Sequence, residues 1–253
     1  MIMSLLTDSD KRARCLCGMP LNLKEILIYP IKVRQVVEIG EKQYSYYLSL
    51  ITNFKKLFET IIDESDDQNK MKELKNAEDF DFLIVVLSFN DDFRELFCKA
   101  MSFFLEGREV QFDKTIGEFT IEGYEMTIKE EEYMELMNII KMQNYLLKKP
   151  ENEEKPSNKK AKELLEKRAK IKAKLEKAKA KDGQALNFVD YISVVNSKSL
   201  NMSIDKCLNM TVYAFFDYLE RLALIDSYDT GVKQIMAGAK PNEVQLKHWL
   251  SKL

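Results

Sequence analysis

The chain has 253 residues, of which 45% are hydrophobic and 10% aromatic, a composition typical of a folded protein with a substantial core. Its formal net charge of −2 at pH 7 argues against a dedicated nucleic-acid coat protein, because such proteins are usually basic throughout. No apolar run reaches the roughly 18 residues that span a bilayer, and the N-terminus has no apolar core of signal-peptide length. We therefore expect no membrane among its partners.

The first part of the chain predicts extended segments followed by helices. Residues 15–31 hold two short apolar runs, broken by Gly18 and Pro20, and predict strands or a loose hairpin. Apolar residues at three- and four-residue spacing then predict helices, the first of which stops at Gly40. These helices are expected at residues 33–39, 41–51 and 54–62. The polar run 63–79 predicts a surface loop.

The middle of the chain predicts two helices, a small sheet and a further helix. Residues 80–89 are almost entirely apolar and predict a buried helix, and Asn90 supplies a cap for the next one, at 92–105. Alternating apolar and polar residues then predict an antiparallel meander with turns at glycines. Its strands are expected at 109–112, 118–121 and 124–128. Thr127 and Glu130 have capping-box spacing and predict a helix up to Leu147.

Residues 148–181 differ from the rest of the chain in charge. They hold 14 Lys/Arg and 6 Asp/Glu, a net of +8, which leaves a net of −10 for the remainder. Residues 158–181 predict one helix, roughly 35 Å long. Two interpretations stay open: a helix that faces solvent or a protein partner, and an arm that meets a nucleic-acid backbone. Because Arg168 is the only arginine of this segment and residues 146–187 contain no aromatic residue, base readout is disfavoured.

The last part of the chain predicts helices only. Asn201 is expected to cap a short helix that runs to Leu208, and Gly238 to end another. Pro241 is expected to open a terminal helix that carries Trp249. The other helices are expected at residues 186–195, 211–224 and 228–237.

The four cysteines predict free thiols. Cys15 and Cys17 are close in the sequence, but as alternate residues of an extended segment they would point to opposite faces. Such a pair suits neither a disulfide nor a shared metal ion. Free thiols are typical of a reducing cytoplasm, and we expect the protein to work there.

Residues that could carry catalysis are sparse. His248 is the only histidine, and a lone histidine is more often a surface or packing residue than a base. Zinc-ligand spacing and glycine-rich phosphate loops are both missing from the sequence. Acidic clusters, which metal-dependent nucleases use, lie where charge commonly serves solubility or a helix dipole. These clusters are 63–67, Asp79 with Asp81, Asp91 with Asp92, and 130–132. We expect neither an enzyme nor a bound cofactor or metal, with a metal-dependent nuclease as a rival hypothesis.

Two segments resemble proteins encoded in the tail-gene modules of phages that infect Gram-positive bacteria. The N-terminal likeness is carried by Pro30, Ile39, Gly40, Glu41, Tyr44, Tyr47 and Leu48. The C-terminal likeness is carried by Met210-Thr211, Phe216-Asp217, Arg221-Leu222, Tyr228-Asp229, Ala237-Gly238-Ala239 and His248-Trp249. The resemblance implies a tail assembly chaperone-like or minor virion protein that binds other phage proteins, such as the tail tube and tape measure. The basic segment does not match that family's pattern.

These observations predict an α+β fold, predominantly α-helical, with a small antiparallel β-meander and a long charged helix. We expect four segments: 1–78, 79–147, 148–184 and 185–253. The leading hypothesis is a non-enzymatic phage morphogenesis protein in the host cytoplasm during assembly. A structural component of the virion, or a nucleic-acid-associated protein that uses the basic helix, is the alternative, and a homo-oligomer fits each of them.

The candidate partner-binding residues are aromatic side chains near the C-terminus and cationic side chains of the basic helix. Aromatic side chains such as these are more often core residues than contact residues. The candidates are Phe215, Phe216, Tyr218, Trp249, Lys167, Arg168, Lys170 and Lys174.

Overall fold

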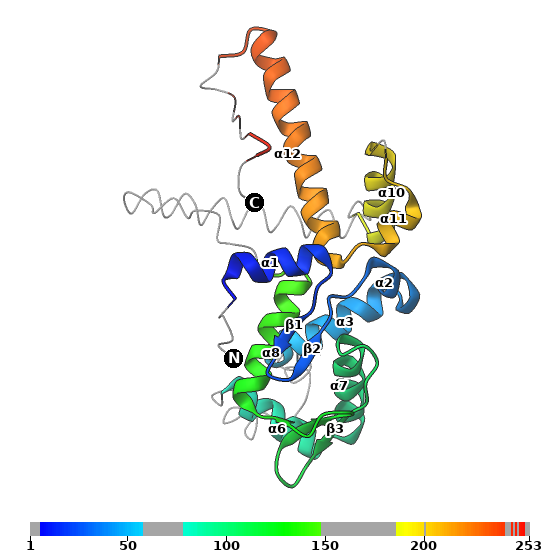
Figure 1. Cartoon of the computed structure of the whole chain (residues 1–253), viewed down its shortest axis with the longest axis vertical. Coiled ribbons are helices and arrows are strands. Elements are labelled where there is room, and N and C mark those ends of the chain that lie inside the picture. The colour runs from blue at the N-terminus through cyan, green and yellow to red at the C-terminus, as the bar shows by residue number, and fades with distance from the viewer. Residues whose placement is uncertain are drawn as a thin grey trace, which may run out of the picture. The chain divides into compact units, whose positions relative to one another are not determined.

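The computed structural model of the chain describes residues 6–57, 78–147, 186–199, 201–240, 244, 246 and 248–250. The described residues are mainly helical, with one two-stranded and one three-stranded antiparallel sheet (Figure 1). The expected α+β class is confirmed. The basic segment 148–181 and residues 63–77 of the loop expected at 63–79 lie outside the described residues, and Asp79 is already helical.

The chain forms two compact units. The first comprises Met1–Leu147 and Leu208–Asp217, and the second comprises Lys148–Cys207 and Tyr218–Leu253. The boundary therefore falls inside the long helix α12 (Val212–Met236), whose first six residues belong to the first unit.

The first unit opens with a helix that the sequence analysis missed. Helix α1 (Asp8–Cys17) begins at Thr7, whose hydroxyl accepts a hydrogen bond from the Asp10 backbone N–H at 3.2 Å. The Asp10 carboxylate accepts one from the Thr7 N–H at 2.9 Å, which completes a capping box. The helix ends at Gly18, with φ +73°. The extended conformation expected at 15–17 is therefore wrong.

The cysteines are free thiols, as expected. Cys15 is buried on α1, and Cys17 is exposed at the end of the same helix. The two cysteines are therefore helical, and the extended geometry expected for this pair is wrong. Burial raises the pKa of Cys15 and of Cys98 to about 11, so both thiols stay protonated at neutral pH.

A hairpin and two short helices follow, close to the expected bounds. Strands β1 (Leu21–Leu23) and β2 (Ile26–Ile28) pair antiparallel, and both bury their first and third residues. Helices α2 (Val33–Ile39) and α3 (Glu41–Thr52) are separated at Gly40, whose φ of +87° favours glycine. Residues 54–57 are helical, and the rest of the helix expected at 54–62 lies outside the described residues.

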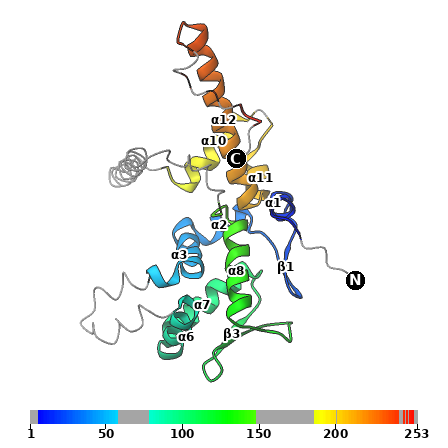
Figure 2. The ribbon, with the colours of Figure 1, turned by 90° about the vertical axis from the view of Figure 1, so that its left-hand side faces the viewer.

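Three helices and the meander complete the core of the first unit. Asn90 caps α7 (Asp91–Phe104), as expected, and separates it from α6 (Asp79–Phe89). In the sheet, β4 (Glu118–Ile121) lies between β3 (Val110–Asp113) and β5 (Thr127–Ile128). Helix α8 (Glu130–Gln143) lies between β1 and α3 (Figure 2). The expected Thr127–Glu130 cap of α8 is wrong, because the Lys129 N–H instead donates to the Glu132 carboxylate at 3.2 Å.

Aromatic rings fill this core. Phe97 is fully buried and lies within 5.8 Å of the Phe54 ring, 5.7 Å of the Phe119 ring and 6.3 Å of the Tyr133 ring, measured between centroids. These rings come from α7, the helical turn after α3, β4 and α8. Apolar residues that the sequence placed on separate helices and strands thus pack together in one aromatic cluster.

The start of α12 is held in the first unit by backbone bonds. The Val33 N–H donates to the Met210 carbonyl at 2.9 Å, and the Val212 N–H donates to the Ile31 carbonyl at 2.8 Å. The Thr211 hydroxyl donates to the Cys15 carbonyl at 3.0 Å. The break expected after residue 224 is wrong, because the sequence there has neither glycine nor proline and the helix continues to Met236.

The second unit contains α10 (Phe188–Lys198), most of α11 (Ile204–Asn209), the remainder of α12 and the described residues that follow it. Ser203, and not the expected Asn201, caps α11 by accepting a hydrogen bond from the Lys206 N–H at 3.2 Å. The terminal helix expected after Pro241 is wrong, because the described residues between 244 and 250 are non-helical. Among the described helices, none is both long and apolar enough to cross a membrane.

Candidate functional site

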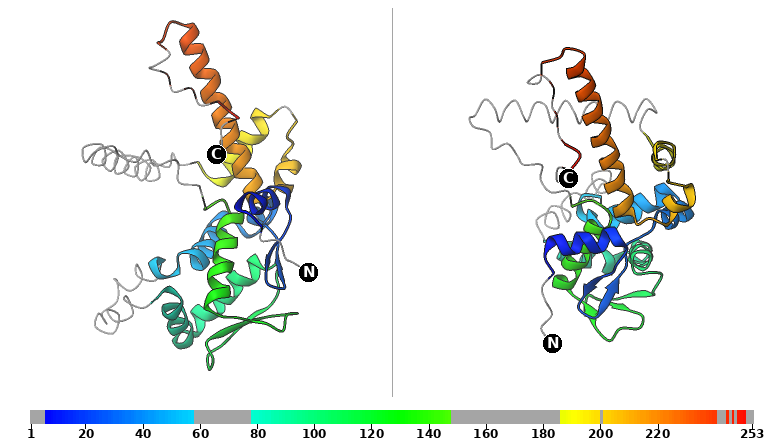
Figure 3. Two further views of the ribbon diagram at one scale, coloured as in Figure 1. Left: turned by 60° about the vertical axis from the view of Figure 1, so that its left-hand side comes forward. Right: turned by 45° about the horizontal axis from the view of Figure 1, so that its top comes forward.

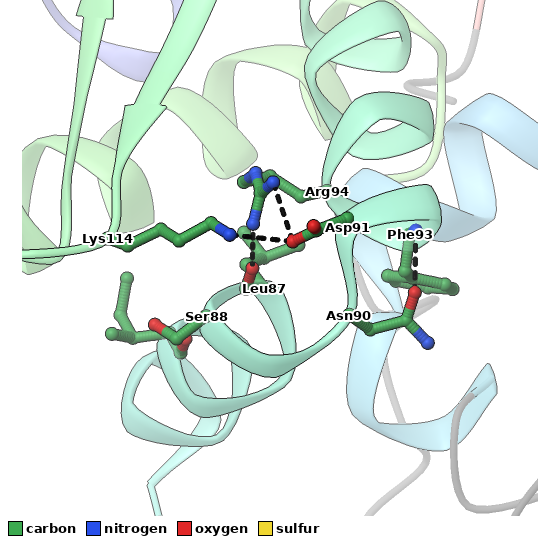
Figure 4. Close-up of polar contacts among 8 residues, drawn as sticks. Leu87, Ser88, Asn90, Asp91, Phe93, Arg94 and Lys114 are labelled. Atoms are coloured by element: carbon green, nitrogen blue, oxygen red, sulfur yellow. Dashed lines mark hydrogen bonds and ion pairs between the residues drawn. The ribbon is translucent and has the colours of Figure 1, made fainter.

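Two of the acidic residues considered as metal ligands, Asp91 and Glu132, form ion pairs within the fold. The Asp91 carboxylate receives the Arg94 guanidinium and the Lys114 ammonium, each at 2.7 Å (Figure 4). The hydrogen bond from Lys114, followed by that from Arg94, lowers the pKa of Asp91. Arg94 also donates to the Leu87 carbonyl at 3.1 Å, near the end of α6 (Figure 4). This cluster joins α6, α7 and the turn after β3.

Glu132, in the acidic first turn of α8, also joins two elements of the fold. The Glu132 side chain, which is buried, forms an ion pair with Lys24 in the turn of the β1–β2 hairpin. Lys24 has φ +51°, a conformation that a non-glycine residue rarely adopts. The hydrogen bond from Lys24 lowers the pKa of Glu132. Within the described ranges, no group of three or more His, Cys, Asp or Glu residues is placed to hold a metal ion.

The four aromatic candidates differ in burial and are divided between the two units. Phe215 is fully buried in the first unit, where its ring lies 5.5 Å from that of Phe216. Phe216 is half-buried and its ring stacks on that of Tyr145 at 6.2 Å. Tyr218, in the second unit, is half-buried and donates to the Ser199 hydroxyl at 2.7 Å. Phe215 thus has the core position that the sequence analysis favoured over a contact position.

Trp249 differs from these residues because 43% of its surface is exposed. The cationic candidates Lys167, Arg168, Lys170 and Lys174 lie outside the described residues.

Trp249 belongs to a short C-terminal stretch that lies along α12 (Figure 3). We call this stretch the strap and define it as Val244, Leu246 and residues 248–250. Arg221 of α12 donates a hydrogen bond from Nη1 to the Trp249 carbonyl at 2.9 Å. The His248 ring lies 5.1 Å from that of Tyr228, at a 70° interplanar angle.

The end of the strap is ordered by its own contacts. The rings of His248 and Trp249 stack at 5.3 Å. The Leu250 N–H donates to His248 Nδ1 at 3.1 Å, so the imidazole accepts a hydrogen bond at that nitrogen. The His248 ring thus contacts the rings of both Tyr228 and Trp249.

Gly231 makes the close approach of the strap possible. A Cβ at this position would lie 2.7 Å from Leu246 Cδ2 and 3.0 Å from Val244 Cγ1. Glycine inside a helix costs about 1 kcal/mol relative to alanine, and here its missing side chain provides room for the strap. The sequence analysis proposed neither Gly231 nor Arg221 as a site residue, although Arg221 is among the residues that carry the phage resemblance. A glycine within a helical pattern was the available signal for the first.

The strap leaves apolar surface uncovered. Leu250 is 71% exposed, and Met236 at the end of α12 is 83% exposed. Other large apolar side chains of the second unit are exposed as well: Leu186, Val189, Val194, Ile204, Ile225 and Leu246. Exposed apolar and aromatic side chains are typical of surfaces that bind other proteins. The strap with the face of α12 beneath it is therefore our candidate site, and what it offers chemically is binding.

The candidate site lies in a region that matches a known family. Residues 177–253 match the family described as the YomV second domain, which is phage-derived and comes from a Bacillus prophage. No curated protein and no solved structure matches the chain. The C-terminal part of the chain is thus similar to a phage domain, in agreement with the phage resemblance of the sequence.

Proposed function

We propose that the protein is a phage morphogenesis protein that acts by binding other proteins and catalyses no reaction. The observation that carries this proposal is the similarity of residues 177–253 to a phage-derived domain. The resemblance of both ends of the chain to tail-module proteins makes a tail assembly chaperone-like role the best-supported one. The partners are then the tail tube and tape-measure proteins, in the host cytoplasm during assembly. Incorporation into the virion as a structural component is the alternative.

The strap provides a contact surface suited to this function. Trp249 is large and half-exposed, its backbone carbonyl accepts a hydrogen bond from Arg221, and its ring stacks on that of His248. Tryptophan is enriched among the residues that dominate binding energy at protein interfaces. A side chain that is already oriented loses less conformational freedom when a partner binds. Leu250 extends the apolar surface beside it.

Co-expression with tail proteins tests the proposal. The tagged full-length protein is produced together with the tail tube and tape-measure proteins of the same phage genome, and we expect at least one to copurify. Trp249→Ala should weaken the capture about tenfold or more, because truncation of an interface tryptophan commonly costs over 1 kcal/mol. Ile116→Ala, which alters an exposed apolar residue in the first unit, is the matched control and should leave the capture unchanged. If neither tail protein copurifies, the proposal is wrong.

A further inference from the structure

The contact between the strap and α12 has the form of a peptide bound to a helical surface. Arg221, Tyr228 and Gly231 are seven and three residues apart, so they lie on one face of α12. The strap runs antiparallel to the helix. Leu246 lies on Gly231, and Trp249 reaches Arg221 ten positions earlier in the helix.

Each copy of the chain therefore carries both a receptor and its ligand. The receptor, which we call the α12 groove, consists of Arg221, Tyr228 and Gly231. Because Gly231 has no Cβ, apolar side chains can approach the helix closely at this position. The Arg221 guanidinium can donate a hydrogen bond to a backbone carbonyl. The strap supplies both features in one stretch. Of the possible occupants of the groove, the strap is the one whose fit the structure displays.

The contacts that bind the strap to α12 within one copy are few. They comprise one surface hydrogen bond from the Arg221 guanidinium to the Trp249 carbonyl, one ring contact between His248 and Tyr228, and aliphatic contacts on Gly231. The aliphatic contacts bury Leu246 only in part, because 41% of its surface stays exposed. The strap follows a chain reversal after α12, where Gly238 has φ +104°. Because the same contacts form whether the strap comes from its own copy or another, exchange between copies sacrifices none of them.

One copy also leaves apolar surface of the second unit exposed. Leu250 of the strap and Met236 at the end of α12 are among the most exposed apolar residues of the described chain. Burial of such side chains against a second copy favours association. The gain opposes the loss of translational and rotational freedom when two copies join.

We infer that the strap docks in the α12 groove of a second copy of this chain, so that two copies exchange straps and form a symmetric dimer. Each copy then gives its strap to the partner's groove and receives the partner's strap in its own. The inference does not depend on the identity of any tail protein, so it can fail while the proposed function stands, and the reverse also holds.

Disulfide trapping between copies tests the exchange. One full-length chain carries Gly231→Cys and a second, differently tagged chain carries Leu246→Cys, both with the exposed Cys17 changed to Ser. The two chains are co-expressed, purified through both tags and oxidised. We expect a disulfide-linked dimer on non-reducing electrophoresis, because the two positions lie in direct contact and Leu246→Cys removes the Cδ2 atom that a Cβ at residue 231 would otherwise meet at 2.7 Å. A chain with Val189→Cys in place of Leu246→Cys is the matched control, since Val189 is exposed in the same unit but outside the groove.

A chain that carries both Gly231→Cys and Leu246→Cys shows where the strap lies when no dimer is trapped. If this chain closes a disulfide within one copy while the mixed chains link no more than the Val189 control, the exchange is wrong. If neither experiment gives a disulfide, the contact itself is absent and the inference is equally wrong.

Sedimentation equilibrium of the unmodified chain is an independent measurement. We expect a monomer–dimer equilibrium, and Leu246→Asp should raise the dimer dissociation constant about tenfold, with circular dichroism used to verify that the helices persist. A wild-type chain that remains monomeric at every concentration overturns the inference.

Discussion

Gly231 occupies a position in α12 where any larger residue would meet the strap. We expect Gly231→Leu to displace Leu246 and Val244, because even one added carbon atom would lie 2.7 Å from Leu246. Trp249 is the only tryptophan of the chain, so its fluorescence reports the strap directly. The emission should move to longer wavelength and acrylamide should quench it more strongly than in the wild type.

Thr230→Leu is the control for this measurement. Thr230 is the exposed neighbour of Gly231 on the same helix, and its substitution should leave the tryptophan emission unchanged. Unaltered emission in Gly231→Leu would mean that the strap does not depend on the space at Gly231.

The ion pair between Glu132 and Lys24 makes stability depend on pH. Because the hydrogen bond from Lys24 lowers the pKa of Glu132 below its usual 4.5, the carboxylate favours folding above that pH. This contribution is lost as the pH falls through the lower pKa of the folded state. We expect Glu132→Gln to unfold at lower denaturant concentration than the wild type at pH 7, and the difference to shrink towards pH 3, as measured by urea titration. A difference that stays constant across this range would contradict the assignment.

At the scale of the elements, predictions succeeded where a local signal dictates the backbone. Gly40 separates α2 from α3 and Asn90 caps α7, because a positive φ and an N-cap each demand particular residue types. The meander was likewise found from its alternation. Helix α1 was missed even though Thr7 and Asp10 form a capping box. Its apolar residues at the C-terminal end were interpreted instead as the start of the hairpin.

The errors near the C-terminus have a different cause. Polar residues around Asp226 interrupt the apolar spacing, but the helix continues to Met236, because residues 225–230 contain neither glycine nor proline. The strap is non-helical since its contacts are specific to α12: a carbonyl bonded to Arg221 and aliphatic groups on Gly231. Such contacts between distant residues leave no trace in local periodicity. The exposed Trp249 was therefore found as a candidate, while the residues that position it were not.

The first turns of α12 also have a structural role that sequence periodicity alone did not reveal. Phe215 is fully buried in the first unit, so Phe215→Ala should leave a cavity and lower the free energy of unfolding by about 3–5 kcal/mol. Phe216→Ala is the matched control, because its half-buried ring should cost less. Chemical denaturation followed by circular dichroism measures both. Equal losses for the two variants would contradict the burial of Phe215.

At the scale of the whole molecule, charge is distributed unevenly along the chain. Residues 148–181 carry a net of +8 and the remainder carries −10. A nucleic acid approaching the basic segment would also meet the repulsion of the acidic remainder, whereas a protein partner can be matched to both. This contrast separates the proposed protein-binding function from a nucleic-acid-associated one.

The salt dependence of DNA binding distinguishes the protein-binding function from the nucleic-acid-associated one. Each phosphate contact contributes about 0.9 to the slope of log K against log salt concentration for duplex DNA. We expect weak DNA binding with a shallow slope, measured by fluorescence anisotropy from low to physiological salt. A variant with Lys167, Arg168, Lys170 and Lys174 all changed to Gln should then behave like the wild type. A steep slope that falls by about 3 to 4 in this variant would instead assign phosphate binding to the basic segment, because four lost cations can account for no more than about four contacts.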